Sequence, residues 1–232
     1  MPVVLLDDSE PLWFPHPDSP PPDGLLAVGG SLTTERLLLA YSNGIFPWES
    51  WGDPPLWHWF SPDPRFLLFP DEFKISRSLR SALKKETFEI RVDTAFEDVI
   101  RSCSRVPRKD QPGTWIAPDM VKAYSKLHAE GFAHSFESYR DGKLVGGLYG
   151  ISLGAAFFGE SMFHHEPEAS KVALAHLVKF AKQQGFRFID CQVPTDHLGN
   201  LGAREVPRTE FLDLLGKGLK TPGIPGPWTT AA

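Results

Sequence analysis

Apolar and polar residues follow two spacings along this chain, one helical and one extended, and together they predict a series of elements after residue 64. Apolar residues spaced three or four apart predict helices over 75–85, 96–103, 118–128 and 170–183. Two-residue alternation and short apolar runs predict strands over 87–92, 133–139, 144–151, 155–162 and 186–193. Asp141-Gly142 indicates a tight hairpin turn between two of these strands. Three consecutive strands, a helix and a further strand favour a mixed sheet of the kind that acetyl-CoA-dependent N-acetyltransferases use.

Local signals mark the ends of one further helix and the start of the helix over 96–103. Thr33 is a suitable N-cap for a short helix, and Gly44 is a suitable residue to end it. Asp93 or Thr94 is expected to cap the helix that begins near Phe96.

The chain divides at a proline-rich junction, Ser61-Pro62-Asp63-Pro64. Before it, residues 1–30 are rich in proline and predict extended structure, and residues 46–60 hold four of the seven tryptophans. We therefore predict a small N-terminal domain over 1–62 and an acetyltransferase-like (GNAT-type) domain with a mixed sheet over 63–232. The expected fold class is α+β.

One strand carries a carboxylate in an apolar setting. In Phe186–Val193, strict alternation places Asp190 and Gln192 on the same face, with their Cα atoms about 7 Å apart. Because a buried charge is costly without partners, such a pair is either satisfied structurally or kept for chemistry. These eight residues alone favour the structural explanation.

A second acid changes that balance. Alternation in the strand over 155–162 places Glu160 between large apolar side chains, so Glu160 and Asp190 share a pocket if their strands are neighbours. Nucleophilic catalysis has little support, because Ser161 is not in a Gly-x-Ser-x-Gly elbow and Asp190 raises the pKa of Cys191. The histidines lack zinc-site spacing, and neither a Walker A nor a Rossmann fingerprint occurs.

Composition and charge narrow the choice of partners. The net charge is −5, but residues 1–60 carry −7 and residues 74–109 carry +5. A local basic patch can bind phosphate on an acidic protein, although a solvated helix face is the simpler explanation. No apolar run is long enough for a membrane span, and no signal peptide is evident. The two cysteines, Cys103 and Cys191, are expected to be reduced core residues of a cytoplasmic protein.

Six short motifs then occur in the order seen in the leucyl/phenylalanyl-tRNA–protein transferases. The resemblance runs from about residue 20 to Arg208. The motifs are Gly24-Leu25-Leu26-Ala27-Val28-Gly29-Gly30, Gly44-Ile45-Phe46-Pro47-Trp48, Ser61-Pro62-Asp63-Pro64-Arg65, Gly113-Thr114-Trp115-Ile116, Gly159-Glu160-Ser161-Met162-Phe163 and Asp190-Cys191-Gln192.

The resemblance implies an aminoacyltransferase. Members of this family move leucine or phenylalanine, and less readily methionine, from tRNA to the N-terminal Arg or Lys of a protein, which marks that protein for N-degron degradation. By the resemblance, the terminal adenosine is held near Trp48, Trp115, Tyr41 and Tyr124. The amino-acid pocket is formed by Leu148, Met162 and Leu177, and the polar centre by Glu160, Asp190 and Gln192.

The residues suit that reaction without a cofactor or metal, because an aminoacyl ester is already activated. We expect Asp190 to accept the proton of the attacking amine, with Gln192 holding it in place; a purely electrostatic role for Asp190, and a role for Glu160 with the basic acceptor side chain, stay open. The tRNA backbone is expected at Lys74, Arg77, Arg80 and Lys84. An acetyl-CoA-dependent N-acetyltransferase and a non-catalytic RNA-binding module remain as alternatives.

Overall fold

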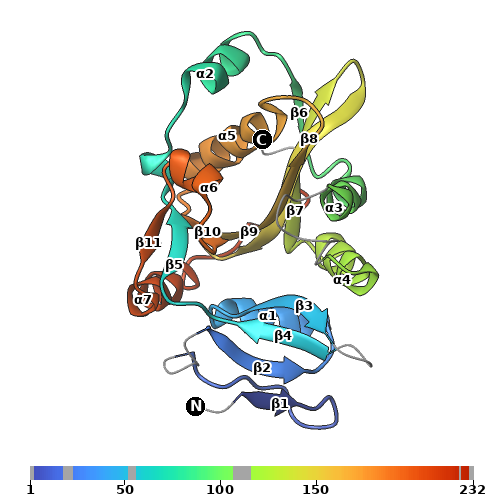
Figure 1. Ribbon diagram of the computed structural model, residues 1–232, viewed down its shortest axis with the longest axis vertical. Coiled ribbons are helices and arrows are strands. Elements are labelled where there is room, and N and C mark those ends of the chain that lie inside the picture. The colour runs from blue at the N-terminus through green and yellow to red at the C-terminus, as the bar shows by residue number, and fades with distance from the viewer. Residues whose placement is uncertain (1–2, 18–22, 52–55, 107–115, 225, 230–232) are drawn as a thin grey trace.

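The computed structural model describes residues 3–17, 23–51, 56–106, 116–224 and 226–229. Within these ranges the strands form two separate sheets (Figure 1). The smaller sheet has four strands in the order β1-β2-β4-β3, and helix α1 packs beside it. The bounds are β1 (Val4–Leu6), β2 (Leu25–Gly29), α1 (Thr34–Ser42), β3 (Phe46–Trp51) and β4 (Leu56–Phe60).

The larger sheet has seven strands in the order β11-β5-β10-β9-β8-β7-β6. Its strands are β5 (Arg65–Leu68), β6 (Glu89–Val92), β7 (Ala133–Arg140), β8 (Lys143–Leu153), β9 (Ala156–His164), β10 (Phe188–Gln192) and β11 (Arg204–Val206). Strands β9 and β10 are parallel, and the other neighbouring pairs are antiparallel. The predicted mixed sheet and the α+β class are therefore confirmed.

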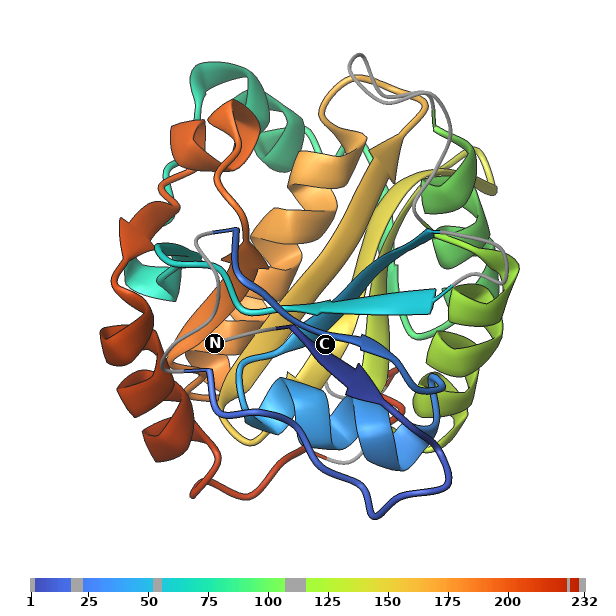
Figure 2. The ribbon, with the colours of Figure 1, turned by 60° about the horizontal axis from the view of Figure 1, so that its bottom comes forward.

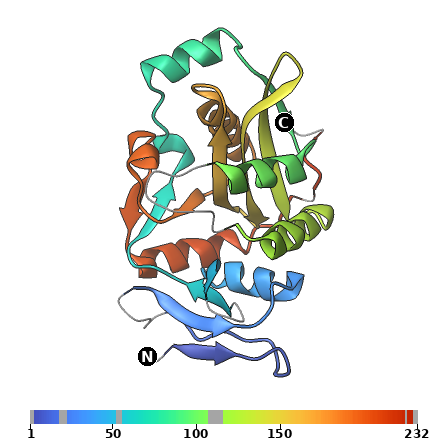
Figure 3. The same ribbon diagram turned by 45° about the vertical axis from the view of Figure 1, so that its right-hand side comes forward.

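Helices cover both faces of the larger sheet. Helix α5 lies on one face and α3 and α4 lie on the other (Figures 2 and 3). Helix α7 lies at the junction with the N-terminal sheet (Figure 1). The bounds are η1 (Pro70–Glu72), α2 (Arg77–Lys84), α3 (Phe96–Arg105), α4 (Pro118–Ala129), α5 (Ala169–Gln183), α6 (Asp196–Asn200) and α7 (Arg208–Gly218). None of the helices in the described ranges is long and apolar enough to cross a bilayer.

Two apolar clusters hold these layers together. One joins the N-terminal domain, α3 and α4 to the sheet, and the other lies between the sheet and α5. The second cluster also receives Trp228 from the C-terminal segment, whose indole is fully buried and stacks on His134 with ring centroids 3.5 Å apart. The cavity described below takes lining residues from both clusters.

The signals at the ends of the first helix are confirmed. The Thr33 hydroxyl accepts from the backbone N–H of Arg36, and the helix ends at Ser42, two residues before Gly44. Gly44 has φ +70°, and a Cβ there would lie only 2.7 Å from the ring of Phe211 on α7. Glycine therefore permits both the turn and the close approach of α7.

The predicted cap of α3 is wrong. The N-cap is Ala95, which makes no side-chain cap, while Asp93 and Thr94 precede it. The carboxylate of Glu137 on β7 accepts from the backbone N–H groups of Thr94 and Ala95 instead. A distant residue thus takes the place of the local cap, which sequence spacing cannot reveal.

The chain leaves the four-stranded sheet after Phe60 and enters the seven-stranded sheet at Arg65. We keep residue 62 as the proposed boundary between the two domains.

Candidate functional site

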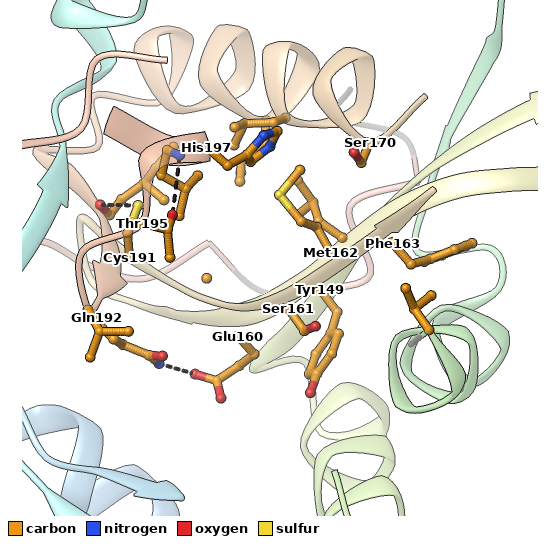
Figure 4. Close-up of a pocket in the computed structure, with 18 of the residues that line it drawn as sticks. Tyr149, Glu160, Ser161, Met162, Phe163, Ser170, Cys191, Gln192, Thr195 and His197 are labelled. Carbon is orange, nitrogen blue, oxygen red and sulfur yellow. Dashed lines mark hydrogen bonds between the residues drawn. The ribbon is translucent and has the colours of Figure 1, made fainter. Parts of the chain in front are cut away.

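A cavity of about 420 Å³ opens beside strands β8, β9 and β10, between α5, α6 and the first residues of β3. Most of its wall is apolar. Figure 4 shows the polar side chains of Glu160, Ser161, Gln192, Thr195 and His197 around it. Its apolar lining includes Phe46, Trp48, Leu148, Met162, Leu174, Leu177, Ile189 and Leu198. An apolar cavity of this size with few polar groups is typical of a small-molecule site.

Glu160 is the centre of a buried hydrogen-bond network on one side of the cavity. Its Oε1 accepts from the Tyr41 hydroxyl and from the Gln192 amide, each at 2.8 Å. Its Oε2 accepts from the Tyr124 hydroxyl at 3.2 Å, and the two tyrosine oxygens lie 2.5 Å apart. Four elements, α1, α4, β9 and β10, thus meet at one carboxylate.

Burial raises the pKa of the Glu160 carboxyl to about 7. The hydrogen bonds from Tyr41, Tyr124 and Gln192 work in the opposite direction, because they favour the charged form, and the nearby charge of Asp190 adds to the rise. A carboxyl with this pKa exchanges protons near neutral pH. That property suits a group that accepts a proton during a reaction.

Asp190 does not line the cavity. Its carboxylate is fully buried and forms a two-pronged ion pair with Arg65, in which Nε donates to Oδ1 at 2.9 Å and Nη2 donates to Oδ2 at 2.6 Å. Oδ1 also accepts from the backbone N–H of Gln192 at 2.8 Å. Our expectation that Asp190 takes the proton directly therefore does not fit the geometry, because its oxygens face Arg65 and the backbone.

The expected shared face of Asp190 and Gln192 is also wrong. The pairing of β10 with β5 shifts register between these two residues, and Gln192 adopts φ +65°. This irregularity turns the Gln192 side chain into the cavity, where it meets Glu160 (Figure 4). Strict alternation fails here because a β-bulge inserts an extra residue on one strand.

Strands β9 and β10 are neighbours, as required for Glu160 to approach the end of β10. The residue that shares the cavity with Glu160 is Gln192 and not Asp190. Cys191 lines the cavity as well and is only partly buried, so our prediction of a core residue holds for Cys103 alone. Burial and the adjacent Asp190 raise the pKa of the Cys191 thiol, which opposes a nucleophilic role.

Three residues expected in the amino-acid pocket, Leu148, Met162 and Leu177, lie in this one cavity, and Trp48 lies at its N-terminal-domain side. Tyr41 and Tyr124 differ from the expectation. They are fully buried and contact Glu160 instead of lining the cavity. Their predicted roles stay predictions, and Trp115 lies outside the described residues.

The four cations expected on the tRNA backbone lie apart from the cavity, on α2 and the segment before it. Helix α2 stands at one end of the molecule (Figure 1). The side chains of Lys74, Arg77, Arg80 and Lys84 are exposed, and none of them has an ion-pair partner among the described residues. By contrast, Arg101 in the same basic segment pairs with Glu97.

Sequence reasoning missed two parts of the site. Arg65 carried a signal, since it is a charge at the start of the apolar stretch Arg-Phe-Leu-Leu in β5, and a buried charge requires a partner. The residues of α6, including His197 and Leu198, gave no local signal. Burial and the nearby Lys171 and His164 lower the pKa of His197, which keeps this cavity-lining ring neutral at pH 7.

The described residues contain no group of three or more His, Cys, Asp or Glu side chains placed to hold a metal ion. What the fold does assemble is an apolar cavity, a buried carboxyl that titrates near pH 7 and an amide that orients it. This arrangement suits a transferase in which an amine attacks an activated ester directly.

Comparison with known proteins identifies the family. Residues 67–216 match the family described as leucyl/phenylalanyl-tRNA protein transferase, and residues 30–63 match the N-terminal domain of the same enzymes. The chain belongs to this family and is an aminoacyltransferase. A curated leucyl/phenylalanyl-tRNA–protein transferase of Myxococcus xanthus is 53% identical over 100% of this chain and 98% of its own length. That of Desulfatibacillum aliphaticivorans is 52% identical over 99% and 97%.

Two solved structures are similar to this chain at low sequence identity. The structure of L-PGS from Bacillus licheniformis has a TM-score of 0.40 at 15% identity, over 75% of this chain and 55% of that one. An aminoglycoside acetyltransferase from a soil metagenomic sample has a TM-score of 0.38 at 17% identity, over 49% and 83%.

Proposed function

We propose that this protein transfers leucine or phenylalanine, and less readily methionine, from tRNA to the N-terminal Arg or Lys of an acceptor protein. The observation that carries this proposal is the contact between Gln192 and Glu160 beside an apolar cavity of about 420 Å³. The cavity can hold an apolar amino-acid side chain, and Glu160 lies at its polar edge. Marking the acceptor for N-degron degradation is the consequence that the family resemblance implies, and a cytoplasmic location fits these substrates.

The acceptor amine attacks in its neutral form, whose conjugate acid has a pKa of about 7.7–8, and the nitrogen must lose one proton as the amide forms. The amine nitrogen forms a bond to the ester carbonyl carbon, and the bond between that carbon and the ribose oxygen breaks. In our proposal Glu160 accepts this proton, because a carboxylate with a pKa of about 7 is an effective base near neutral pH. The proton then passes to the ribose oxygen as it leaves. Positioning of the two substrates supplies much of the remaining acceleration.

In this proposal the side-chain amide of Gln192 orients Glu160. The carboxylate of Asp190 holds Gln192 in turn, by accepting from the backbone N–H of Gln192. Trp48 and Trp115 hold the terminal adenosine. Asp190 therefore keeps a role in the polar centre, but it acts through Gln192 and does not contact the amine.

One assay tests the function directly. The protein is incubated with labelled leucyl-tRNA and a peptide that begins with Arg, and in parallel with the same peptide beginning with Ala. We expect label on the first peptide only. Absence of label on the Arg peptide would overturn the proposal.

The alternative of an acetyl-CoA-dependent enzyme is disfavoured at the start of α5. A pyrophosphate would need a glycine-rich loop with free N–H groups at this helix N-terminus. The segment before the helix holds Glu166 and Glu168 instead, and Glu168 is the N-cap residue. A non-catalytic RNA-binding module would leave the cavity and the raised pKa of Glu160 without a role.

Leu177 lies on α5 and lines the cavity, so its size should influence the choice of amino acid. Leu177→Phe is expected to lower kcat/KM for phenylalanyl-tRNA about 10-fold or more relative to leucyl-tRNA, because the larger ring fills space that the phenyl group needs. The measurement is the ratio of the two kcat/KM values with one Arg peptide. An equal decline for both tRNAs would remove Leu177 from the side-chain pocket.

Arg77 and Arg80 on α2 are expected to contact tRNA phosphates. Reversing both charges, Arg77→Glu with Arg80→Glu, should weaken tRNA binding and reduce the slope of log K against log salt by about 1 for each lost contact. The matched control reverses Arg101 and Arg105 on α3, which changes the net charge equally. If both double variants have the same affinity and slope, α2 is not the tRNA contact.

A further inference from the structure

Arg65 is buried at the junction of the two domains and touches both. Its guanidinium is fully excluded from solvent and lies between the rings of Phe46 and Phe211, 4.8 and 4.5 Å from their centroids. Its Nη1 donates to the carbonyl oxygen of Gly44 at 3.2 Å, and the remaining nitrogens donate to Asp190. A planar group with donors in a fixed fork suits this arrangement, whereas the point charge of a lysine does not.

The pair of Arg65 and Asp190 leads directly to the cavity. Asp190 is held by Arg65 and accepts from the backbone N–H of Gln192. Gln192 has φ +65°, a backbone conformation that is unfavourable for residues other than glycine. The Gln192 amide then donates to Glu160. The strained conformation that turns Gln192 into the cavity is thus held by Asp190, and Asp190 is held by Arg65.

The same guanidinium contacts the N-terminal domain next to the cavity. Phe46, on which Arg65 stacks, lines the cavity together with Trp48, and the two rings are 6.0 Å apart. Arg65 is therefore linked to two residues that line the cavity, to Phe46 directly and to Gln192 through Asp190.

We propose that Arg65 is a positioning residue for aminoacyl transfer, which acts through Asp190 to hold Gln192 against Glu160. The proposal rests on the proposed function, because it concerns the same site. A merely structural role for Arg65 would affect folding and leave the turnover of folded protein unchanged. A positioning role lowers kcat in folded protein and depends on Gln192.

The groups that face Glu160 give the test a second readout. They are Tyr41 from α1, Tyr124 from α4 and, from β10, Gln192 with Asp190 behind it. Hydrogen bonding by Gln192 lowers the pKa of Glu160. Displacement of the amide should therefore raise that pKa, and the acid limb of the profile of kcat against pH should move to higher pH.

The experiment compares Arg65→Lys, Gln192→Ala and the double variant, below their unfolding temperatures and with saturating leucyl-tRNA and Arg peptide. Arg65→Lys is expected to lower kcat about 10- to 100-fold, since small misplacements at a reacting centre have effects of this size. The acid limb of its profile of kcat against pH should move to higher pH, as in Gln192→Ala. The kcat of the double variant should be no lower than that of Gln192→Ala alone. An unchanged kcat, an unmoved acid limb or multiplying effects in the double variant would overturn the proposal.

Arg208→Lys is the matched control. Arg208 is also a buried arginine near the domain junction, and its Nη1 donates to the carbonyl oxygen of Ser61 at 3.0 Å. It contacts neither Asp190 nor Gln192, so it is expected to change thermal stability and leave kcat and the pH profile as they are. A drop in kcat equal to that of Arg65→Lys would show that general loosening of the junction is sufficient, which overturns the specific role.

A second variant and the wild-type protein complete the test. If Arg65→Lys does not fold, the apolar pair Arg65→Met with Asp190→Leu should fold, because a buried ion pair can be replaced by apolar side chains with little loss of stability. That variant is expected to stay slow, and full activity would overturn the proposal. The wild-type protein separates the two hypotheses: no transfer to the Arg peptide defeats the proposed function, whereas wild-type transfer with a fully active Arg65→Lys variant defeats only this inference.

Discussion

Glu160→Gln is expected to slow leucine transfer by about 10²- to 10⁴-fold at pH 8, because the variant removes the group that accepts the amine proton. The glutamine has nearly the same shape and can still accept from Tyr41 at its remaining oxygen. The loss should therefore appear in kcat with little change in KM. Single-turnover transfer to an Arg peptide at saturating leucyl-tRNA is the appropriate measurement.

The pH dependence of the wild-type enzyme should report the same group. Because the base must be ionised to accept a proton, kcat should rise with pH and level off above about 7, where the Glu160 carboxyl has lost its proton. In Glu160→Gln this limb should be absent. If the rise of kcat with pH persists unchanged in Glu160→Gln, the rise reports the ionisation of another group.

Stability should change in the opposite direction. The pKa of Glu160 is about 7 in the folded protein against an ordinary value of 4.5, so the folded state favours the protonated form. The free energy of unfolding should therefore fall as pH rises from about 4.5 to about 7, by about 3 kcal/mol in total. Glu160→Gln does not ionise and should lack this decline. Urea unfolding at pH 5 and pH 8 tests it.

Glu137→Gln is the matched control for both measurements. Glu137 is a fully buried glutamate of the same sheet, but its oxygens accept from Thr94, Ala95 and Ser135, and it does not line the cavity. Its substitution should lower stability and leave kcat of the folded protein unchanged. Transfer lost equally in both variants would mean that packing of the sheet, not proton acceptance, explains the effect of Glu160→Gln.

The sequence predicted the elements well because their signals are local. The Asp141-Gly142 turn, the Thr33 cap and the apolar spacing of α5 each depend on a few consecutive residues, and each appears as expected. The bulge in β10 lies instead beside the ion pair of Asp190 with Arg65, which is 125 residues away in the chain. Strict alternation therefore placed Asp190 and Gln192 on one face, and no local pattern contradicted it.

The same distinction applies within the site. Glu160, Gln192, Leu148, Met162 and Leu177 were identified as candidates, and all line one cavity. The hydrogen bonds between these residues depend on how distant parts of the chain pack together, and those bonds decide the role of each residue. Tyr41 comes from the N-terminal domain and reaches Glu160 only because that domain docks on the sheet. Sequence motifs can nominate such residues but cannot show whether they face a ligand or a carboxylate.

Asp190→Asn is the substitution for which the structure most changes the expected result. From the sequence alone it is a conservative change that keeps the fold. In the structure it leaves the fully buried guanidinium of Arg65 without its counter-charge. Removing one partner of a buried ion pair typically costs about 3–5 kcal/mol of unfolding free energy.

For a chain of 232 residues, a loss of that size corresponds to a fall in Tm of about 6–20 °C. We expect this fall for Asp190→Asn in thermal unfolding at pH 7.5, together with transfer at least about 10-fold slower in the protein that remains folded, because Gln192 loses its support. The apolar pair Arg65→Met with Asp190→Leu should recover most of the Tm and none of the transfer rate. If Asp190→Asn unfolds at the wild-type temperature, the ion pair contributes little, and the bulge that presents Gln192 must be held by the chain around it.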